Sequence, residues 1–352
     1  MNSTVTTTRA TEVVLPGKVE VDGLEITVRD LPAPAAGQVV LRMDATGVSF
    51  AEQQMRRGKY YDQPAFPFVP GYDVVGTVTA VGADVDAALV GGRFAAVTKI
   101  GGWASSLLVE AADLVAVPDA VSAAAAETVA VNGVTAWQMM HRSAKVPAGG
   151  TVVVLGANGG VGSTLVQLAL HAGMTVIGTA SPRHHDALRE LGVTPVDYRD
   201  PAMYQRIRAI APDGVDAVFD HVGGAAIADS WALLRKGGTL VSYGTAATKD
   251  DEGNSQLPVL KSFARLLLWN YLPNGKSALF YNFWAGKRFR PAAFRARLRD
   301  DLTRVLALVA DGVLSPQIAA EFPLSQASKA LALAESRTVA GKVVIVPDAP
   351  RS

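Results

Sequence analysis

The spacing of apolar residues changes along the chain, and each change predicts a different element. Residues 151–155 form a continuous apolar run that ends in glycines, and apolar residues then recur at helical spacing until Gly173. This order predicts a buried parallel strand, a tight turn and a helix. Further apolar runs at 174–180, near Asp216 and near Thr239 continue the alternation. The middle of the chain is therefore expected to form a parallel sheet with helical crossovers.

The chain before residue 123 has a different pattern. Short apolar segments at 24–29, 38–45, 71–81 and 91–97 are separated by turn-forming residues. This spacing predicts a small, mostly antiparallel module. The predicted fold class is therefore α/β, with a Rossmann-type doubly wound parallel sheet in one domain and a mostly antiparallel, β-rich second domain.

The composition is typical of a globular protein. The 352 residues are 49% hydrophobic and 18% charged, which allows two domains with sizeable cores. The net charge of +1 provides no electrostatic basis for binding nucleic acid, and we expect no such partner. No apolar run is long enough to span a membrane, and residues 1–10 lack the pattern of a signal peptide. These features predict a cytoplasmic protein.

Side chains that commonly bind metals are few. The chain has no cysteine, which excludes disulfides, thiol nucleophiles and thiolate-bound metals. Its five histidines are either widely separated, as are His141, His171 and His221, or adjacent, as are His184 and His185. None has the i, i+4 spacing that places two ligands on one helix face. We therefore predict no metal site.

The turn at residues 155–162, LGANGGVG, indicates a dinucleotide site. Gly159 and Gly162 match the second and third glycines of a G-x-G-x-x-G motif, in which Ala157 replaces the first. Glycines let the backbone approach a pyrophosphate closely, and the N–H groups at the start of the helix face its charge. The alternative is an ordinary strand-to-helix turn.

The residues after the next strand indicate which dinucleotide binds. Dinucleotide-binding units place an acidic residue about 20 positions after the glycines, where it binds the ribose hydroxyls. This chain has Ser181 and Arg183 there instead. A hydroxyl and a guanidinium can together bind a 2'-phosphate, which favours NADP(H). The alternative is that Arg183 is a solvated loop residue.

Several longer segments together resemble one family. They are ATGVSFAEQQMRRGKY at 45–60, VPGYDVVGTVTAVG at 69–82, VNGVTAWQMMHR at 131–142, LGANGGVG at 155–162, VDAVFDHVGG at 215–224, GGTLVSYG at 237–244 and ESRTVAGKVVIV at 335–346. With them the chain resembles the medium-chain dehydrogenase/reductase superfamily, and within it the zinc-free quinone oxidoreductase-like branch. The resemblance implies a GroES-like catalytic domain formed by residues 1–123 and 285–352, an NADP-binding Rossmann domain at 124–284, and an active site between them.

The resemblance also implies individual roles. Asn158, Gly159, Gly160, Val161 and Gly162 would hold the pyrophosphate, Ser181, Arg183, Tyr198 and Arg337 the 2'-phosphate, and Thr135, Val222, Tyr243 and Gly244 would line the nicotinamide. Ser49 and Tyr60 lie on the stretch that faces the substrate in relatives, and either is able to donate a hydrogen bond to the reacting oxygen. The alternative for Tyr60 is packing near Tyr61, Phe66 and Phe68.

Positions that bind zinc in other members of the superfamily differ here. Zinc-dependent relatives carry a Cys near position 49, a His-Glu pair after Pro70-Gly71 and a third ligand at 131, whereas this chain has Ser49, Tyr72, Asp73 and Val131. Without a Lewis acid, alcohol oxidation loses its usual mechanism. Hydride addition to a quinone, or to the β-carbon of an α,β-unsaturated carbonyl (enone), needs only a hydrogen-bond donor or water at the oxygen. We therefore predict a zinc-independent, NADPH-dependent reductase; the alternative is a catalytically silent NADPH-binding protein with a structural or regulatory role.

Residues 266–284 are dense in aromatics and precede a basic run at 287–299. The aromatic segment is compatible with a substrate lid, a membrane-surface contact or a subunit interface, and the basic run with the solvated face of a helix. In zinc-free relatives two subunits join edge strands at the place that corresponds to residues 277–284. An exposed edge strand this apolar would pair nonspecifically with strands of other molecules, so we predict a homodimer through this strand.

Overall fold

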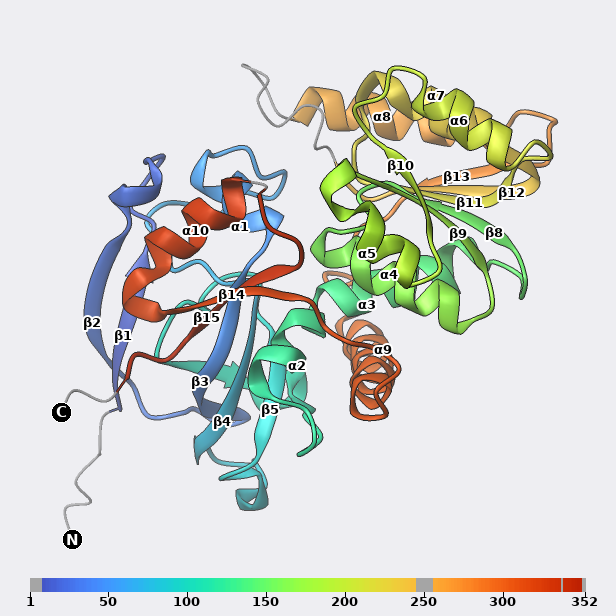
Figure 1. Ribbon diagram of the computed structural model, residues 1–352. Coiled ribbons are helices and arrows are strands. Elements are labelled where there is room, and N and C mark those ends of the chain that lie inside the picture. The colour runs from blue at the N-terminus through green and yellow to red at the C-terminus, as the bar shows by residue number, and fades with distance from the viewer. Residues whose placement is uncertain (1–7, 245–255, 337, 350–352) are drawn as a thin grey trace, which may run out of the picture. The chain divides into compact units, whose positions relative to one another are not determined.

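The computed structural model describes residues 8–244, 256–336 and 338–349, without the side chains of residues 256–262. The chain forms two compact units (Figure 1). We call residues 1–134 with 286–352 the discontinuous unit, and residues 135–285 the central unit. Among the helices that the structure describes, none has the length and apolar character needed to cross a bilayer.

The central unit is built on a parallel six-stranded sheet. Its strand order is β10 (Thr194–Asp197), β9 (Thr175–Ala180), β8 (Thr151–Val154), β11 (Val215–Asp220), β12 (Leu234–Ser242) and β13 (Ser277–Phe280). The chain runs outward from β8 to β10 and then returns to β11 on the other side of β8. Ligands of doubly wound sheets bind at the carboxyl ends of the strands beside such a reversal. The predicted Rossmann-type sheet is confirmed.

Apolar residues on both faces of the central strands explain why this sheet is buried. The side chains of residues 152–154 in β8 and 217–219 in β11 have no exposed surface. Such strands require helices packed against the sheet. The helices are α4 (Gly160–His171), α5 (His185–Glu190), α6 (Met203–Ile210), α7 (Ile227–Ala232) and α8 (Gln256–Trp269).

The discontinuous unit is built on a mostly antiparallel seven-stranded sheet. Its order is β14 (Ile318–Pro323), β15 (Lys342–Val346), β3 (Gln38–Val48), β4 (Asp73–Val81), β5 (Arg93–Val97) and β7 (Val115–Ala116), with β6 (Ser106–Glu110) also paired to β3. Of the pairs described in this sheet, β14 with β15 is parallel and the others are antiparallel. Strands β1 (Thr8–Val14) and β2 (Glu25–Leu31) pair separately. The predicted β-rich module is therefore present.

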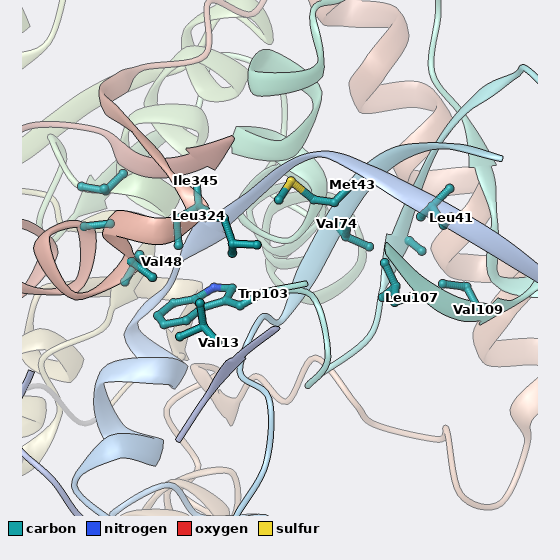
Figure 2. Packing of buried hydrophobic residues seen from close by; sticks show 14 of the residues in the cluster. Val13, Leu41, Met43, Val48, Val74, Trp103, Leu107, Val109, Leu324 and Ile345 are labelled. Carbon is teal, nitrogen blue, oxygen red and sulfur yellow. The ribbon is translucent and has the colours of Figure 1, made fainter. Parts of the chain in front are cut away.

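The core of this unit surrounds Trp103 (Figure 2). Trp103 is fully buried in a cluster that includes Val13, Met43 and Val48. Its indole N–H donates to the carbonyl of Gly47 at 2.9 Å, which satisfies the one polar group of the ring. This contact fixes the end of β3, which leads directly into the candidate residue Ser49.

Two further helices of this unit clarify the domain boundary. Helix α2 (Ala123–Ala130) contacts β3, β4, β5, β15 and α9 (Pro291–Ala310). The predicted boundary after residue 123 separates the first residue of α2 from the rest of the helix, whereas the division in the structure follows Val134, because α2 packs on the discontinuous unit's sheet. Helix α9 has an apolar stripe that is buried at Phe294, Leu298, Leu302, Val305 and Leu306 and half-buried at Val309.

The predicted edge strand at residues 277–284 is shorter in the structure. β13 ends at Phe280, lies at the edge of the sheet and pairs with β12. Tyr281 still donates its N–H to the Ser242 carbonyl at 2.7 Å. Asn282 then begins a turn, because its side chain accepts the N–H of Trp284 at 2.9 Å. The expected strand at residues 281–284 was wrong because this local bond competes with strand pairing.

Candidate functional site

The carboxyl edge of the parallel sheet collects most of the predicted cofactor-binding residues. Parallel neighbours end at the same edge of a sheet. Strands β8 to β12 lead there into Asn158–Gly162, Ser181 with Arg183, Tyr198, Val222, and Tyr243 with Gly244, respectively. Thr135 lies buried on α3 (Asn132–Trp137), and Arg337 lies outside the described residues.

The turn between β8 and α4 is shaped by glycines that have no room for a side chain. Gly156 has a φ of +70°, and a Cβ there would lie 2.5 Å from the ring of His221. A Cβ on Gly162 would lie 2.1 Å from the carbonyl oxygen of Gly156. Helix α4 begins after Gly159, so a glycine occupies its N-cap. The first N–H groups of a helix lack intrahelical partners and suit an anion.

A buried hydroxyl without a partner follows β9. Ser181 is 8% exposed, and its Oγ has no hydrogen-bond partner among the described residues. Because an unpaired buried hydroxyl costs free energy, this position suits a ligand that completes its hydrogen bonds. Arg183 is exposed two residues later, and its Nε donates to Nε2 of His184 at 3.1 Å. Burial, and then the charges of Arg183 and His185, lower the pKa of His184.

A second arginine follows the neighbouring strand, β10. Tyr198 donates its N–H to the carbonyl of Ala180 at 3.4 Å, which places it beside Ser181. The guanidinium of Arg199 lies 5.3 Å from the centre of the Tyr198 ring, and its Nε donates to the Tyr198 hydroxyl at 3.1 Å. Sequence reasoning identified Tyr198 and missed Arg199, because one arginine on a loop forms no pattern.

Asp220 organises the end of β11. Its carboxylate accepts the N–H groups of Val222 and Gly223 at 2.8 and 2.9 Å, and the hydroxyl of Ser230 at 2.8 Å. Three donors offset the cost of burying this charge, since Asp220 is 1% exposed. Asp220 therefore fixes the backbone at Val222. Its position as the last residue of an apolar strand was a signal in the sequence that was not used.

The residues after β12 contact the end of β11. Tyr243 donates its N–H to the carbonyl of Asp220 at 2.9 Å. A Cβ on Gly244 would lie 2.5 Å from the carbonyl oxygen of His221, so the two segments are in close contact. Burial, and then the charge of Asp220, raise the pKa of Tyr243. Its hydroxyl is therefore neutral at physiological pH.

Both candidates for the reacting site lie in the discontinuous unit. Ser49 caps helix α1 (Phe50–Arg56), and its Oγ accepts the N–H of Ala51 at 3.1 Å. The Ser49 hydroxyl also donates to the carboxylate of Glu52, which accepts the N–H of Ser49 at 2.8 Å. This reciprocal arrangement is a capping box, and its S-x-x-E pattern at 49–52 would have identified Glu52 from the sequence. Burial raises the pKa of Glu52, although the hydrogen bond from Ser49 opposes the shift.

Tyr60 is hydrogen-bonded as well as packed. It is 9% exposed, and its hydroxyl lies 2.9 Å from the hydroxyl of Tyr72. Its ring centroid is 4.6 Å from that of Tyr61, whereas Phe66 and Phe68 stack on each other at 5.5 Å. Sequence reasoning noted Tyr72 only as a departure from the zinc-binding pattern, because the contact with Tyr60 depends on the folding of two loops.

A buried ion cluster lies beside Tyr72. Lys342 Nζ lies 2.9 Å from Asp73 Oδ2 and 2.6 Å from Glu127 Oε1, and all three side chains are at most 2% exposed. Asp73 Oδ2 also accepts the N–H of Val131 at 3.2 Å. Burial raises the pKa of Glu127, whereas the charge of Lys342 opposes the shift. Burial alone would lower the pKa of Lys342, but the two carboxylates raise it.

The residues at the zinc positions of zinc-dependent relatives thus have other contacts here. Ser49 caps α1, the N–H of Tyr72 donates to Glu52 Oε1 at 2.7 Å, and Val131 presents an apolar side chain. Across the described ranges, His, Asp and Glu form no group of three or more that could hold a metal ion. The cap at Ser49 follows from the S-x-x-E pattern, whereas the bond between Tyr72 and Glu52 was not apparent from the sequence.

A cavity of about 500 Å³ opens at the opposite, amino edge of the parallel sheet. It is lined by residues 147–151, Asp213, Asp216 and Arg235, among others. The Asp216 carboxylate pairs with Arg235 and accepts the N–H of Thr151 at 2.8 Å. This cavity is separate from the strand ends that carry the predicted cofactor residues, and we assign it no chemistry.

Known proteins are similar to this chain in sequence and in architecture. The family model for a zinc-binding dehydrogenase matches residues 191–345, and the model for an alcohol dehydrogenase GroES-like domain matches residues 35–119. The Homo sapiens synaptic vesicle membrane protein VAT-1 homolog is 31% identical over 321 residues, which cover 90% of this chain and 80% of that protein.

Solved structures extend the similarity to the fold. A mycobacterial protein complexed with NADPH matches with a TM-score of 0.80 and 26% identity, covering 96% of this chain and 100% of that one. A quinone oxidoreductase of Pseudomonas syringae pv. Tomato DC3000 matches with a TM-score of 0.82 and 25% identity over 96% and 100% of the two chains. Both sheets, the glycine turn and these similarities lead to one conclusion: the chain belongs to the medium-chain dehydrogenase/reductase superfamily.

Proposed function

We propose that the protein is a zinc-independent, NADPH-dependent reductase of quinones or α,β-unsaturated carbonyls. The observation that supports this most directly is the buried Ser181 hydroxyl without a partner, on the sheet edge that also carries Arg183 and Arg199. A hydroxyl and two guanidinium groups suit the 2'-phosphate that distinguishes NADPH from NADH. The complex of a mycobacterial relative with NADPH supports the same cofactor.

The remaining predicted positions fit the other parts of the cofactor. Residues 158–162 would hold the pyrophosphate, because glycines there leave space and α4 offers its first N–H groups. Thr135, Val222, Tyr243 and Gly244 would line the nicotinamide. When bound, NADPH supplies a hydride, which with one proton converts a quinone to a hydroquinone or an enone to the saturated carbonyl, leaving NADP⁺.

The protein's own contribution would be to bind the oxygen on which negative charge develops. A fixed hydroxyl donor stabilises that charge more in the transition state than in the ground state. Ser49 and Tyr60 are the candidate donors of the discontinuous unit. The similarity to a quinone oxidoreductase favours a quinone as the substrate.

A second candidate is a catalytically silent NADPH-binding protein. The name of the human VAT-1 homolog describes a vesicle membrane protein and states no reaction. In addition, the hydroxyls of Ser49 and Tyr60 already bond to Glu52 and Tyr72.

NADPH oxidation with a panel of benzoquinones, naphthoquinones and enones separates the two candidates. Binding of NADPH and NADH is measured in parallel by fluorescence titration. Turnover with at least one compound and tighter binding of NADPH are expected. Tight NADPH binding without turnover would support the silent protein, and equal affinity for both cofactors would contradict the assignment of the 2'-phosphate site.

We also propose a homodimer joined at β13. Helix α8 contacts this edge strand. Asn270, the residue after α8, donates its side-chain amide to the carbonyl of Ala278 and accepts the N–H of Ala278, both at 2.8 Å. The outer face of α8 and the turn after it expose large apolar side chains, namely Phe263 (47%), Leu267 (59%), Leu268 (66%), Tyr271 (80%) and Leu272 (45%). Monomers rarely expose such patches, and a second copy packed on the outer face of α8 beside β13 would cover them, while Asn270 already satisfies the outward N–H and carbonyl of Ala278.

The oligomeric state tests this proposal. Leu268→Ser is expected to weaken dimerisation by roughly tenfold or more, because a buried leucine contributes about 1.5 to 3 kcal/mol. Sedimentation velocity would show the shift, with Leu191→Ser as the control at an exposed position on another helix end. A wild type that is monomeric at micromolar concentration would contradict the dimer, and vesicle binding would then test the membrane-contact alternative.

A further inference from the structure

Four buried or capping side chains of the discontinuous unit form one connected set. They come from the start of α1, the loop after it and the segment before β4, and are Ser49, Glu52, Tyr60 and Tyr72. Glu52, Tyr60 and Tyr72 are 2%, 9% and 5% exposed, respectively. The two candidate donors, which the sequence presents as independent, are thus linked through Glu52 and Tyr72.

The carboxylate of Glu52 joins two segments. Its Oε2 accepts hydrogen bonds from both the N–H and the hydroxyl of Ser49, and its Oε1 accepts the N–H of Tyr72 at 2.7 Å. A carboxylate is a stronger acceptor than a neutral carbonyl oxygen, so the Ser49 proton is directed at Glu52. Ser49 therefore caps the start of α1, and Glu52 fixes the backbone from which the Tyr72 side chain projects.

The Tyr72 hydroxyl in turn sets the direction of the Tyr60 hydroxyl. The two oxygens are 2.9 Å apart, and the rings meet edge to face with centroids separated by 6.4 Å. Each tyrosine hydroxyl has one proton and two acceptor sites, so a bond to one fixed neighbour restricts the rotation of its O–H. Burial raises the pKa of Tyr61, so the hydroxyl beside Tyr60 also stays protonated.

We propose that Tyr72 and Glu52 are positioning residues: the Tyr72 hydroxyl donates to the Tyr60 hydroxyl, which leaves the single proton of Tyr60 for a hydrogen bond to the substrate oxygen. This inference rests on the proposed reductase function. It assigns Ser49 to the helix cap rather than to the reaction. The substrate class it implies is one with a carbonyl oxygen that gains negative charge, as in quinones and enones.

A double-mutant cycle with the best substrate of the panel tests the proposal. Tyr60→Phe is expected to lower kcat by roughly a hundredfold, as the loss of an oxyanion donor does. Tyr72→Phe is expected to lower kcat by about tenfold, and the double variant should be no slower than Tyr60→Phe alone, because Tyr72 acts only through Tyr60. NADPH affinity, measured by fluorescence, should be unchanged in all three variants.

Two further variants separate positioning from loss of structure. Thr77→Val removes a hydroxyl of β4, the strand after Tyr72, that donates to Asp44 of β3 at 2.7 Å, and this variant should retain wild-type kcat. Glu52→Gln keeps the shape of the side chain and, since it weakens the hold on Tyr72, should lower kcat without changing NADPH affinity. It also supplies the test if Tyr72→Phe does not fold.

The outcomes are distinguishable. An active wild type with unchanged kcat in Tyr72→Phe, or with additive losses in the double variant, would overturn the positioning role alone. An active wild type with unchanged kcat in Tyr60→Phe would overturn Tyr60 as the donor. A wild type that binds NADPH but reduces no compound would overturn both the proposed function and this inference.

Discussion

The two units build their polar sites in opposite ways. In the central unit the predicted site is made largely of backbone, with Gly156 at φ +70° and a Gly162 that has no space for a Cβ. In the discontinuous unit it is made of buried side chains, and the ion pair of Lys342 with Asp73 joins residues 269 positions apart. The glycine turn depends on local sequence, whereas the buried side-chain network depends on contacts between distant segments.

This difference determines what a substitution does. A glycine turn has few partners, so an added methyl group should block the ligand while most of the fold persists. A buried side-chain network has partners that remain charged after one member is removed, so a substitution there should damage the fold itself. Binding and stability should therefore separate between the two units.

The largest effect is expected from Lys342→Met. The substitution leaves the carboxylates of Asp73 and Glu127 buried without their cation, which typically costs about 3 to 5 kcal/mol. Urea unfolding followed by circular dichroism measures the loss, with the exposed Lys329→Met as the control. A loss below roughly 1 kcal/mol, the scale of an exposed ion pair, would show that the cluster does not depend on its lysine.

Gly162→Ala tests the glycine turn of the central unit. The new Cβ would lie 2.1 Å from the Gly156 carbonyl oxygen, so the turn must shift and lose the shape that suits a pyrophosphate. NADPH affinity should fall by roughly a hundredfold, or about 2.7 kcal/mol, in a fluorescence titration. Gly17→Ala is the control, because a Cβ there meets nothing within 4 Å. Wild-type affinity in Gly162→Ala would show that the turn does not contact the cofactor.

Smaller, selective effects are expected at the two arginines beside Ser181. Arg183→Ala and Arg199→Ala should each weaken NADPH by about tenfold to a hundredfold, since a hydrogen bond to a charged group contributes roughly 1.5 to 3 kcal/mol. NADH affinity should barely change. Arg189→Ala, which breaks an exposed ion pair with Asp186, is the control. Equal losses for both cofactors would contradict a role in 2'-phosphate binding.

The smallest effect is a pH dependence at Glu52. Burial raises its pKa above the ordinary 4.5, so the folded protein holds this proton more tightly than the unfolded chain does. The resulting stabilisation is complete below about pH 4.5 and is lost as pH rises through the folded pKa. Unfolding free energies measured between pH 5 and about pH 8 should therefore decline more steeply for wild type than for Glu52→Gln. Parallel curves would contradict the raised pKa.

Much of the central unit was predictable because its signals are local. The run at 151–155, the glycines after it and the helical spacing to Gly173 each specify the conformation of a few neighbouring residues, and the structure places β8 and α4 there. The same holds for the fold class and the family. The end of β13 was missed because one side chain, that of Asn282, turns the chain at the strand's end.

The amino-acid sequence was therefore sufficient to predict the pair of folds, the superfamily and the residues that follow the strands at the sheet edge. It did not predict that the Ser181 hydroxyl lacks a partner among the described residues, that the hydroxyls of Tyr60 and Tyr72 meet, or that Lys342 pairs with Asp73 and Glu127. The physical reason is that apolar periodicity encodes which face of an element is buried. The pairing of a buried polar group depends instead on which distant segment the finished fold brings within about 3 Å of it.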